Sequence, residues 1–198
     1  TKKVVDGNTV EQLYTYPETG YVNLFNAHIL DAPVIVEEKS DGKTVSKAET
    51  KYNNVGNTLP TSILATNISD GTTKTTMKFD LYDEKGNLLQ FTSSVGIPTA
   101  IVYGYDKTQP IAKIEGATYG QVTPYIQAIV DASNADAQNP ANEQALLTAL
   151  DNFRKTTALK DSLDTVYQNQ VILQPDFSLD VITIADSSNI FYSDLLLS

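Results

Sequence analysis

The sequence predicts a mainly β fold that carries an inserted helical hairpin at about residues 120–157. Two observations support this prediction. Before residue 115, apolar and polar residues alternate in short runs that Gly-centred turns separate, which is the pattern of half-buried strands. Beyond residue 119, apolar residues recur every three or four positions, as on one face of a helix. We therefore expect a β segment at 1–118, a helical hairpin at 119–160 and a further β segment at 161–198.

Glycine marks the turns of the first β segment. Asp6-Gly7-Asn8, Asp41-Gly42, Asp70-Gly71 and Gly96-Ile97-Pro98 each lie between two alternating runs. Such residues favour the left-handed backbone that tight hairpin turns require, so the recurrence indicates consecutive hairpins. Prolines fall near the predicted strand ends, where a missing backbone N–H does least harm: Pro17, Pro33, Pro60, Pro98 and Pro110.

The best defined turn is the segment 82–87, which reads Tyr-Asp-Glu-Lys-Gly-Asn. It lies between an alternating run that begins at Met77 and a return strand that begins at Leu88. Asp83 is expected to cap a type I turn with its carboxylate, and Gly86 to take the left-handed position that forms a G1 bulge.

This Tyr-Asp-x-x-Gly-Asn arrangement resembles the YD repeat of Rhs-type and teneurin-type proteins. A degenerate copy opens at Tyr52, and the stretch 14–160 is similar to a Bacteroidetes-type YD-repeat protein, most clearly over 101–115. The resemblance implies short hairpins wound into a large hollow β shell. It assigns architectural roles to the residues that match the motif, which are Tyr82, Asp83, Gly86, Asn87, Tyr105 and Asp106.

Two helices are expected after the hairpins. Thr123 and Pro124 suit the start of the first helix, and Asn139 with Pro140 suits the start of the second. The apolar stripes are Ile126, Ile129 and Val130 in the first helix, and Leu146, Ala149, Leu150 and Phe153 in the second. A helical hairpin cannot extend a sheet, so we expect it to cover an apolar sheet face or to plug an opening in the shell.

Beyond Lys160 the resemblance ends. Strand-like apolar runs continue at 171–173, 179–184 and 190–192. Three origins stay open for this last segment: a divergent repeat, a junction to another domain, or a piece that is not contiguous with the rest in the native gene.

Composition excludes several classes of function. A formal net charge of −10 repels nucleic acid and anionic membrane surfaces. The chain has no cysteine, so it forms no disulfide and no thiolate site. No apolar run approaches the roughly 20 residues of a membrane span, and the first residues lack the apolar region of a signal peptide.

Residues for chemistry are sparse. His28 is the sole histidine, lies among apolar residues, and is predicted to be a structural, hydrogen-bonded side chain. No G-x-S-x-G elbow occurs, and the oxygen-rich segment 131–136 lacks the glycine and glutamate of an EF-hand, so it is interpreted as a polar helix end. Four acids could meet as a glycosidase pair, but chance proximity is the preferred interpretation: Asp80, Asp83, Glu84 and Glu115. We predict no catalytic residue, no cofactor and no metal site.

The leading hypothesis is a non-catalytic structural segment of a large secreted or cell-surface YD-repeat protein. Family resemblance implies that the shell encloses or presents a C-terminal effector such as a toxin, or mediates contact between cells. The expected partners are neighbouring repeats, a secretion or surface partner and an encapsulated effector domain. The alternatives are an adhesin-like β module that binds carbohydrate or protein and, less favoured, a glycosidase.

Overall fold

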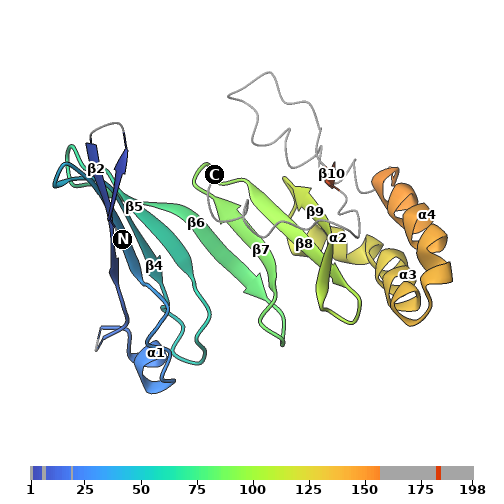
Figure 1. Cartoon of the computed structure of the whole chain (residues 1–198). Helices are drawn as coiled ribbons and strands as arrows, with labels where there is room; N and C mark the ends of the chain where they lie inside the picture. Colours follow the sequence, from blue (N-terminus) through green and yellow to red (C-terminus); the bar gives the residue numbers. More distant parts are fainter. Residues whose placement is uncertain (1, 6–7, 19, 157–181, 184–198) are drawn as a thin grey trace. The chain divides into compact units, whose positions relative to one another are not determined.

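The structure is a computed structural model, and it confirms the prediction of a mainly β fold. Antiparallel strands come first, and a short helical hairpin follows them (Figure 1). The described residues are 2–5, 8–18, 20–156 and 182–183. Apart from residues 182 and 183, the predicted β segment at 161–198 therefore lies outside the described residues.

The chain divides into two compact units. Unit 1 contains Thr1–Asp80 and Thr92–Gly96, and unit 2 contains Leu81–Phe91 and Ile97–Ser198. Two strands therefore contribute residues to both units, namely β6 (Thr73–Tyr82) and β7 (Leu88–Ser93).

Unit 1 is an antiparallel sheet whose strands follow one another in chain order, as the recurring turns predicted (Figure 1). Asp41 and Gly42, with φ of 48° and 77°, form the left-handed two-residue turn between its third and fourth strands. Besides β6, the strands of this sheet are β1 (Lys2–Val5), β2 (Asn8–Thr15), β3 (Ile35–Ser40), β4 (Lys43–Lys51) and β5 (Ser62–Thr66).

A short helix, α1 (Val22–Asn26), interrupts the predicted run of strands. Its end is a Schellman motif, because the N–H of His28 donates to the carbonyl of Phe25 at 3.1 Å and that of Ile29 to the carbonyl of Leu24 at 3.0 Å. His28 takes the left-handed position of this motif, with φ of 56°, where glycine is usual.

The prediction of a hydrogen-bonded histidine is therefore wrong. The side chain of His28 is exposed, and its ring makes no hydrogen bond within the described residues. The role of His28 is instead the left-handed backbone conformation that ends α1. The alternation of apolar and polar residues does not predict that conformation.

Unit 1 has a very small core. Leu24 and Val34 are each 1% exposed and Pro17 is buried, but these residues precede or follow the strands. No residue of β2, β3, β4 or β5 is fully buried among those whose burial is described. The sheet is therefore one layer of strands with both faces partly open to solvent.

Unit 2 is built on the hairpin of β8 (Pro98–Gly104) and β9 (Gln109–Glu115). A two-residue strand, β10 (Ile182–Thr183), pairs antiparallel with β9 opposite Lys113 and Ile114. In contrast to unit 1, this hairpin has a buried face: Ala100, Val102, Ile111, Ala112 and Ile114 are all at most 5% exposed.

The first helical segment starts earlier than predicted. Thr118 and Gln121 form a capping box, which begins α2 (Tyr119–Val122). Thr123 follows that helix and donates its hydroxyl to the carbonyl of Tyr119 at 2.7 Å, so it does not cap a new one. Residues Thr123–Tyr125 form a 3-10 turn, η1, and α3 (Gln127–Gln138) comes after it.

The second helical segment begins as predicted. The side chain of Asn139 accepts a hydrogen bond from the N–H of Ala141 at 3.1 Å, and Pro140 is the first residue of the 3-10 turn η2 (Pro140–Asn142). The helix α4 (Glu143–Arg154) continues from this turn.

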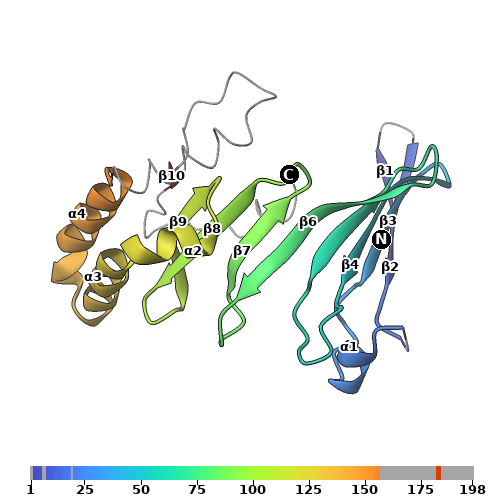
Figure 2. The same cartoon turned by 180° about the vertical axis from the view of Figure 1, so that it is seen from behind.

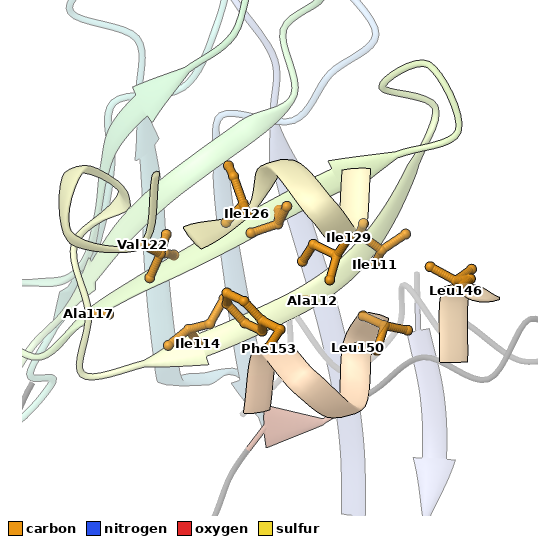
Figure 3. Packing of buried hydrophobic residues seen from close by; sticks show 12 residues of the cluster. Ile111, Ala112, Ile114, Ala117, Val122, Ile126, Ile129, Leu146, Leu150 and Phe153 are labelled. Carbon is orange, nitrogen blue, oxygen red and sulfur yellow. The ribbon is translucent and has the colours of Figure 1, made fainter. Parts of the chain in front are cut away.

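Helix α3 packs on β8 and α4 packs on α3 (Figure 2), and apolar side chains of both helices share one core with those of the β8–β9 hairpin. Packing on an apolar sheet face is one of the two placements expected for the helical hairpin. Figure 3 shows Ile129 of α3 and Phe153 of α4 in the layer of apolar side chains over β9. Each fully buried side chain of this size stabilises the fold by roughly 1.5–3 kcal/mol. Ile129 is 0% exposed and Phe153 is 4% exposed, so unit 2 has the core that unit 1 lacks.

Replacing His28 by glycine is expected to stabilise the chain by about 0.5–1 kcal/mol, since glycine meets no steric penalty at positive φ. Urea unfolding followed by circular dichroism measures the change. Ala27→Gly is the matched control, because Ala27 has an ordinary φ of −83° and gains nothing from glycine. Equal effects of the two substitutions would contradict this account of the helix end.

Candidate functional site

The turn from Asp83 to Asn87 has the predicted geometry. The Oδ1 atom of Asp83 accepts hydrogen bonds from the backbone N–H of Lys85 and of Asn87, both at 2.9 Å. Its Oδ2 atom accepts a third bond from Nδ2 of Asn87 at 3.0 Å. Gly86 has a φ of 84°, which is the left-handed position expected for it. The carboxylate of Asp83 thus organises the whole turn, while Tyr82 is half-buried in β6 just before it.

These bonds change the acidity of Asp83. Burial by itself raises the pKa of this carboxyl, but the hydrogen bonds from Asn87 and Lys85 outweigh burial and hold the pKa below its ordinary value. The positive charge of Lys107 acts in the same direction. The turn is therefore built around an ionised carboxylate.

The turn between β8 and β9 has a different geometry. Tyr105, Asp106 and Lys107 have φ values of 51°, 54° and 62°, so three consecutive non-glycine residues are left-handed. Each such residue costs roughly 1–2 kcal/mol, which other contacts of the turn must offset. The second Tyr-Asp pair therefore does not repeat the side-chain cap of Asp83.

The two turns contact each other. Nδ2 of Asn87 donates to the carbonyl of Lys107 at 2.9 Å, and the ammonium of Lys85 donates to the carbonyl of Asp106. The ammonium of Lys107 in turn forms an ion pair with Glu84. Residues that are about twenty positions apart in the sequence thus form one polar cluster, which we call the turn junction: Asp83, Glu84, Lys85, Gly86, Asn87, Tyr105, Asp106 and Lys107.

Side chains of α3 also form hydrogen bonds with the turn junction. Oγ of Ser133 accepts from the N–H of Tyr105 at 3.2 Å, and Oδ1 of Asn134 accepts from the N–H of Asp106 at 2.8 Å. The hydroxyl of Tyr105 donates to Oδ2 of Asp136 at 2.8 Å. These bonds satisfy backbone groups of a strained turn, which explains how the left-handed run is maintained.

The tyrosine of this contact is protonated over a wide pH range. Burial raises the pKa of Tyr105 to about 12, and the hydrogen bond to the carboxylate of Asp136 adds to the effect. Tyr105 therefore acts as a hydrogen-bond donor, since its phenol stays neutral well above physiological pH.

A glycine permits the close approach of turn and helix. A Cβ atom at Gly104 would lie 2.1 Å from Oγ of Ser133 and 2.7 Å from its Cβ. No side chain fits at that distance, so α3 can dock here only against glycine. Ser133 itself is 0% exposed and donates its hydroxyl to the carbonyl of Val130 at 2.7 Å.

The structure thus brings together Asp83, Gly86, Asn87, Tyr105 and Asp106 of the six residues that match the repeat motif, and Tyr82 directly precedes the first turn. The sequence analysis missed their partners Ser133, Asn134 and Asp136. The signal was present in the oxygen-rich segment 131–136, which was interpreted as a polar helix end. Its side chains face a neighbouring turn, and a single sequence does not reveal that contact.

The acids considered for glycosidase chemistry have structural partners. Asp80 accepts from the hydroxyl of Thr92 at 2.6 Å and pairs with Lys78, and Glu115 pairs with Lys113 at 2.8 Å. Asp83 and Glu84 belong to the turn junction. Within the described residues, no group of three or more histidine or acidic side chains is placed to hold a metal ion.

A groove of about 510 Å³ lies between α3 and α4. Ile129 and Phe153 line it together with Tyr125, Thr148 and Asn152, and none of the described residues that line it is charged. These described residues therefore offer no acid, base or anionic ligand. In the part of the chain that the structure describes, no helix is long and apolar enough to cross a membrane.

Comparison with protein-family models and with curated proteins gives no match.

Gly86→Val is expected to destabilise unit 2 by roughly 1–3 kcal/mol, because a β-branched side chain is strained at positive φ. Chemical unfolding of both proteins measures the difference. Gly56→Val is the matched control, since Gly56 has open space around it and no left-handed backbone. An unfolding midpoint that Gly86→Val leaves unmoved would show that the turn does not need this conformation.

Asp83→Asn is expected to lower the unfolding free energy by on the order of 1 kcal/mol at neutral pH, because it removes an ionised acceptor. The folded-state pKa of Asp83 lies below its unfolded value, so its stabilisation is present above about pH 4 and disappears as the pH falls through the lowered pKa. Unfolding curves from pH 7 to pH 2 should show the two proteins converging. A difference that stays constant with pH would contradict a role for the charge.

Proposed function

We propose that this chain is a non-catalytic structural segment of a large secreted or cell-surface YD-repeat protein. The observation that carries the proposal is the open sheet of unit 1. None of the described residues of β2, β3, β4 and β5 is fully buried, although several are large and apolar. Leu13, Tyr14 and Val45 are 43%, 40% and 52% exposed. A sheet is normally stable when at least one face packs on another layer, so this one suits a larger assembly.

The turn junction supports the same proposal. Its polar groups bond to one another and to α3, and this arrangement serves to hold consecutive hairpins in register. Fixed contacts between successive hairpins are what a wound β array needs, because each hairpin is stabilised by its neighbours. On this proposal Asp83, Gly86 and Asn87 have an architectural role.

Neighbouring repeats are the proposed partners of the segment, and the family resemblance extends the proposal to an effector that the complete shell encloses or presents. On this proposal, any catalytic activity belongs to the effector and not to this segment. The acidic surface fits this assignment, since a net charge of −10 favours solubility and disfavours binding to nucleic acid.

Amide hydrogen exchange tests the proposal by comparing this chain with a longer product of its native gene. In the isolated chain, kept at a concentration low enough for it to be monomeric, amides of β8, β9 and α3 should be well protected, while those of β2–β5 exchange rapidly because no core covers them. In the longer product, β2–β5 should become protected by at least about tenfold, and β8 and β9 should change little.

Equal protection of β2–β5 in the two products would contradict the proposal. The isolated chain would then be complete as a fold, and an autonomous binding module would explain it better. The strands β8 and β9 are the internal control in both samples, since their core belongs to unit 2.

A further inference from the structure

The two faces of the sheet of unit 1 differ in their share of charged side chains. Residues directly opposite each other in paired strands share a face, and residues two apart in one strand share it as well. Glu37 lies opposite Lys47, and Glu11 lies opposite Lys39. The face that contains them, which we call the charged face, carries four acidic and four basic side chains over β2–β6: Glu11, Glu37, Glu49, Asp80, Lys39, Lys47, Lys51 and Lys78.

Ion pairs are formed on the charged face. Lys39 pairs with Glu37 at 3.6 Å, Lys51 with Glu49 at 2.5 Å and Lys78 with Asp80 at 2.9 Å, and the partners of each pair are two residues apart in one strand. The acids of these pairs are 26%, 26% and 14% exposed, and they lose their remaining solvation when another surface covers them. The charged face is therefore the less favourable of the two faces for a further contact.

The opposite face, which we call the apolar face, has a different composition. Tyr14, Val36, Ala48 and Ala65 lie in one row across four strands, each directly opposite the next. A second row contains Thr50, Ile63 and Met77. Within β2–β6, three charged residues share this face, with Glu38 in mid-sheet and Lys43 and Lys74 close to strand ends. Tyr14 is 40% exposed and Val36 is 36% exposed, so the centre of this face is open to solvent.

We infer that the apolar face of one chain packs against the same face of a second copy, so that two sheets form a sandwich. The inference rests on the proposed function only in taking the sheet as one layer of a larger β assembly. A face packed on its own copy is self-complementary about a two-fold axis. Because each chain carries a net charge of −10, two copies repel each other, and a contact through a region with few acids adds least to that repulsion; within β2–β6 the apolar face has one acid, Glu38.

The area of the apolar face is sufficient for this contact. Five strands spaced by about 4.8 Å, each covering roughly 20 Å of length, present on the order of 500 Å² per copy. Two copies then bury about 1,000 Å² in total, which is the lower limit for a specific interface. The dimer should therefore be of moderate strength, with a dissociation constant on the order of micromolar.

Sedimentation of the full chain over a range of concentrations tests the inference, with two variants that differ only in the face they alter. Tyr14 and Leu13 are adjacent in β2, they are 40% and 43% exposed, and they lie on the apolar and the charged face respectively. The wild type should dimerise reversibly. Tyr14→Lys should weaken the dimer by at least about tenfold, because it buries an ammonium group, whereas Leu13→Lys should leave it unchanged.

A second measurement detects the dimer without placing a charged side chain in the interface. The chain contains no cysteine, so Val36→Cys and Leu13→Cys each provide one attachment point for a pyrene label. Excimer emission that rises with concentration is expected for the label at residue 36 and is not expected at residue 13. Circular dichroism of each variant confirms that the strands are intact.

A chain that stays monomeric at all concentrations would overturn the inference. A dimer that Tyr14→Lys and Leu13→Lys weaken equally, or excimer emission from residue 13 alone, would overturn it as well. These outcomes leave the hydrogen-exchange comparison with the longer gene product unaffected, so failure of this inference and failure of the proposed function are distinguishable.

Discussion

The close contact between Gly104 and Ser133 is the constraint on which unit 2 depends. It allows the end of β8 to approach α3 so closely that Oγ of Ser133 accepts a bond from the next backbone N–H. From this point Asn134 and Asp136 can reach the turn as well, and three left-handed residues become tolerable. The turn then offers its carbonyl groups to Lys85 and Asn87. One glycine thus sets the position of a helix and of two turns.

Unit 1 is stabilised by different interactions. Its strands are joined mainly by backbone hydrogen bonds, while its few fully buried side chains lie beyond the strand ends. Around α1, Nδ2 of Asn23 lies within 3.1 Å of the carbonyl oxygens of Tyr52, Asn54 and Asn57. Tyr21 donates to Glu49 at 2.5 Å and packs edge-on against Tyr52, and burial followed by the bond to Glu49 raises the pKa of its phenol. Such local contacts hold a loop well but add little to the stability of an uncovered sheet.

The two units differ in how fully their own side chains specify the fold. A core like that of unit 2 specifies one arrangement of β8, β9 and the helices, whichever chain or partner lies nearby. The uncovered apolar face of unit 1 can gain further stability by burial against another surface. On the proposed function, the core of unit 2 would maintain the geometry and the open sheet of unit 1 would form contacts with neighbouring parts.

Local rules were sufficient for the hairpins, for the Asp83 cap with Gly86, and for the start of α4 at Asn139 and Pro140, because the partners in each case lie within a few residues. The same kind of reasoning misplaced the first helix, since Thr118 and Gln121 form a competing cap that begins one turn earlier. It also missed α1, whose end depends on the backbone of His28.

The sequence by itself determined the strand pattern, the turn chemistry and the apolar stripes of the helices, because these follow from backbone sterics and from residue spacing. Only the tertiary structure decided that the Tyr105 turn meets the Asp83 turn, and that the oxygen atoms of residues 133, 134 and 136 hold it. Only the strand register decided which face of unit 1 is charged, since β-bulges after Glu38 and Ile63 change the alternation. Both outcomes depend on contacts between residues far apart in the chain, and such contacts have no local signature.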